Sequence, residues 1–515
     1  MRPTAGECTT VKDAASPTAA LDFLLLLFIA NLVLQPLVEP DFGWHLRAGL
    51  DLISQGWFLP VTDPYSHTMS EWHWVEHAWL TDGILGLLHR ALGAYGPMAM
   101  ILLFGSAGAG ALWIGAKTGS AHRTARMVAM VCGLWVALPY LGARTQLVSL
   151  VGVALVLWVW TRMLRGSPRL RWWLPPIFLV WSNLHGGFTA GIFLLGLALA
   201  VSVGCRLLVE WRILQEGAVG EAILTRQEIS RVIVVLAASC AVTLVNPYGW
   251  HLHGEIYDSL MDRYMLENLR EWQPVSFQGW AGRAYLLYLV GLLLLAGGFY
   301  RRIEPVRWVL LAVFFLLSLL HWRNVTLFLV VSVPLLAELL EAAGGRFVRA
   351  WSNRRMALQG GLAALTVVAG VALYQLGADH LLHVWRCGTE TDRYFEQTEY
   401  PIEAVRWIRD HRDQVGSHLY NEYGHGGFLL WWLPDQRIFI DGRMPAWRLG
   451  DRRIFPDYIR LNQADRAGLE ILAKYHVDWA LVGKGTPLAE ALSGRAGWTV
   501  LYADPKVLVI KKEMS

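Results

Sequence analysis

Long apolar runs separated by short polar loops constrain the fold of this chain more than any other feature. Runs of this length cross the hydrocarbon core of a bilayer as helices. They lie near residues 21–38, 97–116, 127–141, 146–160, 174–182, 188–205, 232–245, 283–300, 308–320, 325–342 and 357–375. Only 17% of the 515 residues are charged, against roughly a quarter in a soluble protein. We therefore expect an α-helical polytopic membrane protein of about eleven transmembrane helices, its membrane region covering 21–377.

The distribution of basic residues predicts how these helices are oriented. Arginine and lysine gather in alternate loops, which contain Lys117, Arg123, Arg126; Arg162, Arg165, Arg169, Arg171; Arg206, Arg212, Arg226, Arg231; Arg301, Arg302, Arg307; and Arg346, Arg349, Arg354, Arg355. Short basic loops stay in the cytoplasm. The N-terminus and these five basic loops share one side of the membrane only if the ambiguous run 78–92, which contains Asp82, does not cross the bilayer. We therefore expect 78–92 to be an interfacial helix, residues 1–20 to be cytoplasmic and the C-terminus to be extracytoplasmic.

Residues 39–96 then form one long external loop that lies on the membrane surface. Its first helix should cover roughly Asp41–Gln55, because apolar side chains recur there at helical spacing and Gly56 follows. Pro60 and the Asp63–Pro64 pair indicate a turn before the second surface helix at 78–92.

Residues 378–515 have the composition of a soluble domain. "YPIEAVRWIRDHR" predicts a helix with Pro401 at its start, and "RIFIDGR" predicts a buried strand. "AGLEILAKYHVDWALVG" predicts a helix followed by a strand, and "WTVLYADPKVLVIKK" predicts a hairpin with its turn at Asp504–Pro505. The alternation predicts a small extracytoplasmic α/β domain.

The expected topology gathers the unusual polar side chains at the external ends of the helices. They are Asp41, His45, Arg144, Gln146, Asn183, His185, Asn246, His251, His253, Glu255, Glu271, His321 and Arg323. Ionisable groups near membrane depth usually line a site. A carboxylate facing cations at a lipid interface suits group transfer from a lipid phosphate, because the carboxylate deprotonates the acceptor and the cations stabilise the departing phosphate.

Simpler interpretations remain open for several of these residues. Arg144 and Arg323 also fit as anchors that extend to the membrane surface. His73 and His77, at i, i+4 spacing, and the neighbouring His251 and His253 could bind a metal, although no carboxylate supports them in the sequence. The net charge of +4 comes from scattered arginines and does not suggest a nucleic-acid partner.

The motifs resemble a group of bacterial multispanning proteins that is similar to the GT-C glycosyltransferase superfamily. They are "PDFGWHLRAGLDLISQG", "TDPYSHT", "HAWL", "ARTQLVS", "WSNLHGGF", "NPYG", "REWQP", "WRNVTLFLVVSVP" and, in the tail, "YNEYGHGGFLLWWLP" with "RIFIDGR". That superfamily includes protein O-mannosyltransferases, aminoarabinose transferases and oligosaccharyltransferase catalytic subunits.

The resemblance implies an integral membrane glycosyltransferase that uses a polyprenyl-phosphate or -diphosphate sugar. An acidic residue of the first external loop is catalytic in the superfamily, which makes Asp41 the best match and Asp63 the second. His45, Arg144, Gln146, His185, His253, Glu271 and Arg323 are then the candidates for binding the donor phosphate and the substrates. The acceptor would be a glycan, lipid or protein of the envelope, and the compartment the bacterial inner membrane.

The second external loop departs from the superfamily, since it has Arg144 and Gln146 where many members have an acidic residue. We find no complete acidic pair, which favours a metal-independent reaction over one that uses a divalent cation. The same departure keeps a second hypothesis open, a non-catalytic protein that binds lipid-linked glycans or scaffolds envelope assembly.

Overall fold

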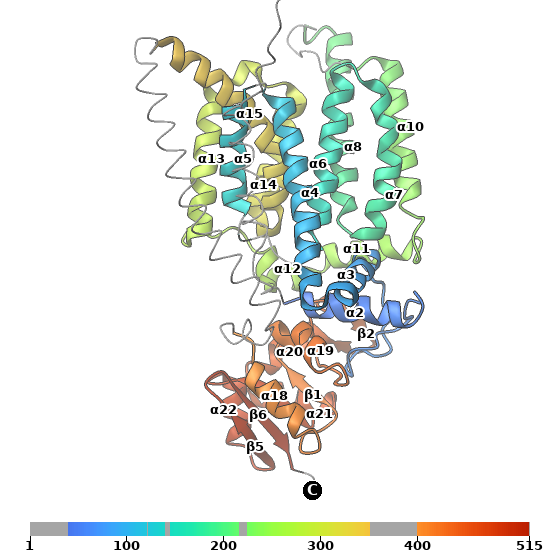
Figure 1. Cartoon of the computed structure of the whole chain (residues 1–515), viewed down its shortest axis with the longest axis vertical. Helices are drawn as coiled ribbons and strands as arrows, with labels where there is room; N and C mark the ends of the chain where they lie inside the picture. Colours follow the sequence, from blue (N-terminus) through green and yellow to red (C-terminus); the bar gives the residue numbers. More distant parts are fainter. Residues whose placement is uncertain are drawn as a thin grey trace, which may run out of the picture.

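The computed structural model describes residues 40–120, 122–137, 139, 145–215, 224–350 and 399–513. A helical bundle forms its upper part in Figure 1 and a smaller mixed region its lower part. The bundle helices are α4 (Gly96–Gly119), α5 (Arg123–Ala137), α6 (Leu147–Leu164), α7 (Leu174–Leu184), α8 (Phe188–Glu210), α10 (Arg226–Val242), α13 (Trp280–Gly298), α14 (Pro305–Leu320) and α15 (Val325–Ala350).

Each expected span within the described residues corresponds to one of these helices, whereas 21–38 and 357–375 lie outside them. In the described part of the chain, five helical stretches are long and apolar enough to cross a membrane: Trp79–Gly119, Leu147–Leu164, Phe188–Glu210, Trp280–Gly298 and Trp322–Gly344. α14 is apolar but shorter. The chain is therefore an integral multi-pass membrane protein.

The helices alternate in direction, so their connections separate into two groups. One group contains the basic residues and lies at the upper end of the bundle in Figure 1; it consists of the α4–α5, α6–α7, α8–α10 and α13–α14 connections. The α7–α8, α10–α13 and α14–α15 connections lie at the lower end, where α11 (His251–Met261) and α12 (Arg263–Asn268) are also found. The bundle thus has a basic end and an opposite end that faces the C-terminal part of the chain.

Two helices lie across the lower end of the bundle, α2 (Phe42–Ser54) and α3 (Trp79–Leu92). By length and composition, Trp79–Gly119 counts as one apolar helical stretch. Within it, however, Gly93 has a φ of 58° and turns the chain between α3 and α4. This agrees with a helix at 78–92 that does not run along the bundle.

α2 is more enclosed than a membrane-surface helix. A Cβ on Gly49 would lie 1.9 Å from the carbonyl oxygen of Asp82 in α3. On the other side, a Cβ on Gly43 would lie 2.0 Å from the carbonyl oxygen of Gly427 in α19 (Gly426–Trp432). Glycine at both positions lets the backbones approach closely, so α2 joins the bundle side to the C-terminal region, which we define as residues 399–513.

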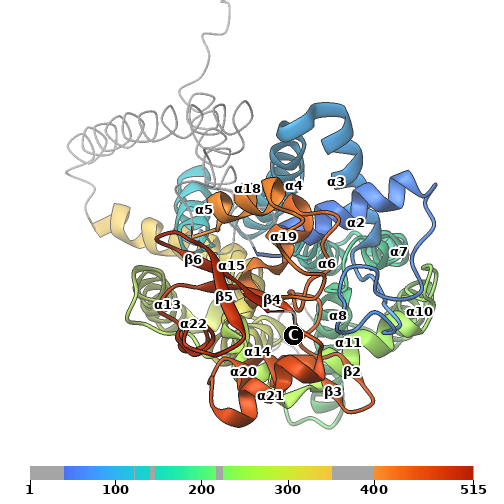
Figure 2. The ribbon, with the colours of Figure 1, turned by 90° about the horizontal axis from the view of Figure 1, so that it is seen from below.

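The C-terminal region contains a four-stranded sheet in the order β1-β4-β6-β5. Its strands are β1 (Leu419–Asn421), β4 (Trp479–Gly483), β5 (Trp498–Ala503) and β6 (Val507–Lys512), and its helices, besides α19, are α18 (Ile402–Asp410), α20 (Ile454–Leu461), α21 (Arg466–Lys474) and α22 (Pro487–Ser493). β1 and β4 are parallel, and the other pairs are antiparallel. A short antiparallel ribbon of β2 (Arg448–Leu449) and β3 (Arg452–Arg453) is separate from this sheet, and in the view from below it lies next to α11 and α21 (Figure 2). The predicted α18, α21–β4 unit and β5–β6 hairpin are confirmed.

The prediction that "RIFIDGR", residues 437–443, forms a buried strand is wrong. Residues 438–441 are buried, but among the described residues the segment makes only an isolated bridge, between Ile438 and Ser66 of the first loop. The Asn421 side chain takes the place of a neighbouring strand, because it accepts from the Phe439 N–H at 2.8 Å and donates to the Ile440 carbonyl at 2.8 Å. The pattern predicted burial correctly but not the partner.

Candidate functional site

Asp41 lies where α2, the bundle and the C-terminal region meet, which we call the junction. It is the N-terminal cap residue of α2, and Trp44 Nε1 donates to its Oδ1 at 3.1 Å. Asp41 is partly exposed as a residue, but its carboxylate lies against Gly442. Burial raises the pKa of Asp41, Glu271 adds to the rise, and the hydrogen bond from Trp44 lowers it by less. A carboxylate with a raised pKa can accept and hold a proton.

Glu271 and Arg323, two predicted site residues, are paired. They come from the short 3-10 turns Arg270–Trp272 and Trp322–Asn324, which precede α13 and α15. Arg323 Nη1 donates to Glu271 Oε1 at 2.9 Å, and its guanidinium lies 4.5 Å from the centre of the Trp272 ring. The stacking holds a cation at the lower end of the bundle, within electrostatic range of the junction.

Three histidines share the electrostatic environment of Asp41 and Arg323. His45 follows Asp41 by one turn of α2, and burial lowers its pKa to about 3. The rings of His77 and His185 meet edge to face at 5.5 Å. Burial is the main cause that lowers the pKa of both, to about 3 for His77, and the charge of Arg323 lowers each further. All three are therefore neutral at neutral pH.

The hydrogen bonds of His185 indicate its tautomer. The Gly187 N–H donates to His185 Nδ1 at 3.0 Å, and Ser149 Oγ lies 2.8 Å from the same atom. An acceptor at Nδ1 places the proton of the neutral ring on Nε2. His185 can therefore donate one hydrogen bond from its other face.

Asp63, the second candidate for the catalytic carboxylate, is a buried ion-pair partner. Arg443 Nη1 donates to Asp63 Oδ1 at 2.7 Å, and the N–H of Ser66 donates to Oδ2 at 2.9 Å. The Asp63 side chain has 0% exposure. Its oxygens are thus engaged within the protein, which makes Asp63 a structural link.

Arg443, which sequence analysis did not single out, connects the first loop to the C-terminal region. Besides Asp63, it binds Asp441 through Nε at 2.9 Å and Nη2 at 2.7 Å. Aromatic rings surround its guanidinium, with centroids 4.8–5.9 Å away, from Trp44, Tyr65, Trp74 and Trp447. The charge of Arg443 acts on His45, and that of Asp441 acts on Asp41. The signal in the sequence was "DGR" inside a buried apolar run.

The remaining predicted residues lie at different places. Arg144 is outside the described residues. Gln146 caps α6, next to Thr145, whose Oγ1 lies 3.5 Å from His45 Nε2. His253 instead lies 2.9 Å from Thr243 Oγ1 and packs on the Phe188 ring. The junction therefore gathers Asp41, His45, His185, Glu271 and Arg323, while His253 belongs to the packing of α11 on α8 and α10.

A second set of buried polar groups lies behind Asp41. His45, Glu76 and Asp82 bring one possible metal-ligand atom each within 4.8 Å of one another. Among the described residues this is the group of histidine, cysteine and carboxylate side chains that could bind a metal ion. Sequence analysis noted Asp82 as an acidic residue in an apolar run but did not connect it to Glu76.

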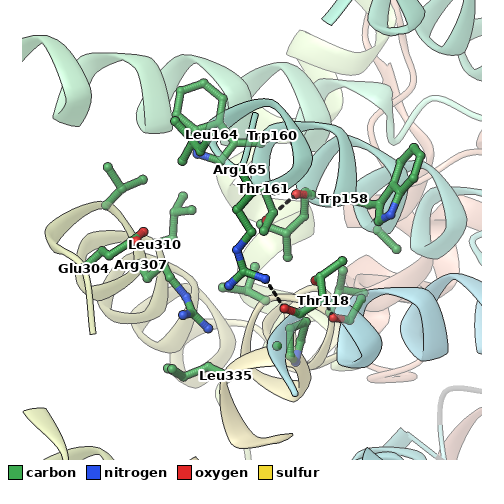
Figure 3. Close-up of a pocket in the computed structure, with 18 of the residues that line it drawn as sticks. Thr118, Trp158, Trp160, Thr161, Leu164, Arg165, Glu304, Arg307, Leu310 and Leu335 are labelled. Carbon is green, nitrogen blue, oxygen red and sulfur yellow. Dashed lines mark hydrogen bonds between the residues drawn. The ribbon is translucent and has the colours of Figure 1, made fainter. Parts of the chain in front are cut away.

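A separate pocket lies at the basic end of the bundle, far along the helices from the junction. α4, α6, α14 and α15 line it, and Figure 3 shows the Arg165 guanidinium pointing to the Thr118 carbonyl. Arg307 lines the same pocket and pairs with Glu338 at 2.6 Å. Because it contains none of the residues of the junction, we do not include it in the candidate site.

The sequence matches no protein-family model and no curated protein. Its structure, however, matches solved membrane glycosyltransferases over most of its length. One is the Archaeoglobus fulgidus oligosaccharyltransferase AglB in complex with an inhibitory peptide and a dolichol-phosphate, with a TM-score of 0.58 and 11% identity over 90% of this chain and 69% of that one. Another is ArnT from Cupriavidus metallidurans in the apo state, with a TM-score of 0.53 and 14% identity over 96% and 98%.

A third match is the same archaeal oligosaccharyltransferase tethered to an acceptor peptide, with a TM-score of 0.55 and 10% identity over 98% of this chain and 75% of that one. At these identities the matches show the fold. The chain has the GT-C fold, as the resemblance of its motifs implied.

Proposed function

We propose that this GT-C-fold membrane protein transfers a sugar from a polyprenyl-phosphate or -diphosphate donor to an acceptor of the cell envelope. The reaction takes place at the extracytoplasmic face of the bacterial inner membrane, with the N-terminus and the basic end of the bundle in the cytoplasm. The observation that carries this proposal is the position of Asp41, a carboxylate of raised pKa at the junction, within electrostatic range of Glu271, which pairs with Arg323.

Asp41 serves as the general base. It takes the proton of an acceptor hydroxyl or amine as that group attacks the anomeric carbon of the donor sugar. The new bond forms at this carbon, the bond from the carbon to the phosphate oxygen breaks, and the lipid phosphate leaves with the electron pair. A raised pKa favours a base that must hold the proton it receives.

Arg323 stabilises the negative charge on the departing phosphate. A guanidinium suits this task because its planar donors match phosphate oxygens. Arg144, which belongs to the second loop, is the other cation we assign to the phosphate. Glu271 positions Arg323 before the donor arrives, and His185 donates a hydrogen bond from Nε2 to the donor or acceptor.

The C-terminal domain, 378–515 by composition, helps to hold the acceptor beside Asp41. Its "DGR" segment already touches the candidate base, and the Arg443 ion pairs fix this segment to the first loop. Asp63 acts through Arg443 and is a positioning residue. The bound dolichol-phosphate and peptide in the archaeal oligosaccharyltransferase support a lipid phosphate donor for a chain of this fold.

One observation favours the alternative, a non-catalytic protein that binds lipid-linked glycans or scaffolds envelope assembly. The charge of Arg323 is already balanced by Glu271 at 2.9 Å, so this cation is less available to a new phosphate. Arg144 and Gln146 also replace the second acidic residue of the superfamily. Such a protein binds a polyprenyl phosphate without turning over a glycolipid.

The test uses the purified full chain, lipid-linked sugars extracted from the source membranes, and an envelope extract as acceptor. Release of free polyprenyl phosphate, followed by mass spectrometry, reports transfer. Asp41→Asn should lower release by about 10²–10⁴-fold and leave polyprenyl phosphate binding unchanged. The matched control is Asp51→Asn, in the same helix but paired with Arg47 at 2.8 Å. Undiminished release by Asp41→Asn removes Asp41 from this role, and binding without any release by the wild-type protein supports the scaffold.

A further inference from the structure

The cluster behind Asp41 is formed by His45 in α2, Glu76 in the loop before α3, and Asp82 in the first turn of α3. His45 Nδ1 lies 2.7 Å from Asp82 Oδ1, and one candidate ligand atom from each residue lies within 4.8 Å of the other two. The exposed fractions are 5% for His45, 2% for Glu76 and 1% for Asp82. Three side chains that are distant in sequence thus meet in a volume the size of a metal coordination shell.

The protein satisfies this cluster only in part. Glu76 Oε1 accepts from the Ala78 N–H at 3.0 Å. Within the described part of the chain, Glu76 Oε2 and Asp82 Oδ2 have no hydrogen-bond partner, although both atoms are buried. A buried carboxylate is costly unless it is paired. Two carboxylates and one imidazole leave this cluster short of positive charge.

We propose that His45, Glu76 and Asp82 bind a divalent transition-metal cation, Zn²⁺ or Mn²⁺. One imidazole nitrogen with two carboxylates is a ligand set of these ions, whereas Ca²⁺ and Mg²⁺ prefer oxygen alone. The cation balances the two carboxylates and gives their free oxygens a partner.

The cation connects α2 to α3 and so positions Asp41. The His45 N–H bonds the Asp41 carbonyl at 3.2 Å, one turn earlier on α2. The same two helices approach closely at Gly49 and Gly86, where a Cβ on Gly86 would lie 2.6 Å from the Gly49 carbonyl carbon. This proposal does not rest on the proposed function, because a structural cation is expected here whether or not Asp41 is catalytic.

The experiment measures the metal content of the purified full chain after exposure to Zn²⁺ or Mn²⁺ and dialysis, together with its Tm in each cation and in EDTA. We expect about one equivalent of metal and a Tm several degrees higher in the cation than in EDTA, as binding to the folded state requires. Glu76→Gln and Asp82→Asn should each lose at least about tenfold in affinity and most of the Tm response. Asp51→Asn, the matched control, should keep both.

The proposal is overturned if the wild-type protein takes up no metal and its Tm does not change with either cation or with EDTA. In that case the two carboxyl groups share a proton. Metal that persists in both variants overturns it as well. If the variants do not fold, the wild-type X-ray absorption spectrum decides: one imidazole with oxygen ligands supports this site. Two or more imidazoles place the ion at other histidines and overturn it.

Discussion

The carboxylate of Asp41 lies against the backbone of Gly442, so closely that a Cβ on Gly442 would lie 1.6 Å from Asp41 Oδ1. The two residues are 401 positions apart by their numbering and belong to the first loop and the C-terminal region. This contact places the candidate base on a surface that the C-terminal region provides. The helical bundle and the first loop alone therefore do not build the junction.

Gly442→Ala tests this contact. The added methyl group must displace the Asp41 side chain, and a displacement of about 1 Å lowers kcat/KM by about 100-fold. The cost in stability should be about 1–3 kcal/mol, as for other overpacked sites. Thermal unfolding and the polyprenyl phosphate release assay measure the two effects.

The control is Gly424→Ala, since no atom lies within 4 Å of a Cβ at that position. In an Asp41→Ala background, Gly442→Ala should cost almost nothing, because the clashing carboxylate is gone. An equal loss of stability in both backgrounds would show that the methyl group meets another part of the structure.

Asp63→Asn tests the structural role of the second acidic candidate. The substitution leaves Arg443 in its aromatic surroundings with one carboxylate fewer, and breaking a buried ion pair typically costs about 3–5 kcal/mol. We expect a lower Tm and faster proteolysis between the bundle and the C-terminal region. The fraction that remains folded should retain the wild-type kcat, and a kcat as low as that of Asp41→Asn would contradict the positioning role.

Arg323→Met and Glu271→Gln test whether Arg323 is a phosphate ligand or a membrane anchor. If Arg323 binds phosphate, Arg323→Met should weaken the binding of a polyprenyl phosphate by about 10–100-fold, the contribution of a charged hydrogen bond. Glu271→Gln should strengthen it, because the guanidinium loses a competing anion. Native mass spectrometry of the lipid complex measures both.

Arg307→Met is the matched control for this pair. Arg307 also binds a carboxylate, that of Glu338, at 2.6 Å, and its side chain is 25% exposed, compared with 26% for Arg323. It lies at the basic end of the bundle, so its substitution should leave lipid phosphate binding unchanged. Equal effects at both ends would indicate nonspecific attraction of the anionic lipid.

Glu255 in α11 gives the protein a pH-dependent stability. Burial, the neighbouring Asp258 and, in the opposite direction, a hydrogen bond from Trp447 set its pKa at about 7, above the ordinary value of 4.5. The folded state therefore binds the proton more tightly than the unfolded state, and this group lowers the stability as pH rises through the interval from 4.5 to about 7.

Glu255→Gln removes that dependence, because glutamine does not titrate. The Tm of the variant minus the Tm of the wild-type protein should therefore be larger at pH 8 than at pH 5. Tm measured at both pH values checks the sign. A larger gain at pH 5 would mean that the folded state favours the ionised carboxylate.

The sequence alone determined the helices of the bundle and the elements α18, α21 and β4 to β6. Apolar runs and their periodicity are local, and the backbone must satisfy its hydrogen bonds within each membrane helix. Local charge patterns also indicated which loops share an end of the bundle. Asp41 was predicted because it follows directly on an apolar run.

Only the tertiary structure decided which polar groups meet. Nothing in local spacing pairs Asp63 with Arg443, places Glu76 beside Asp82, or sets the Asp41 carboxylate on Gly442. The segment 437–443 shows why: its apolar pattern required burial, but the partner, a bridge to Ser66 and the Asn421 side chain, depended on which surfaces came together. A buried charge is stabilised by whichever donor the folded chain brings to it, and that donor can come from any distance along the sequence.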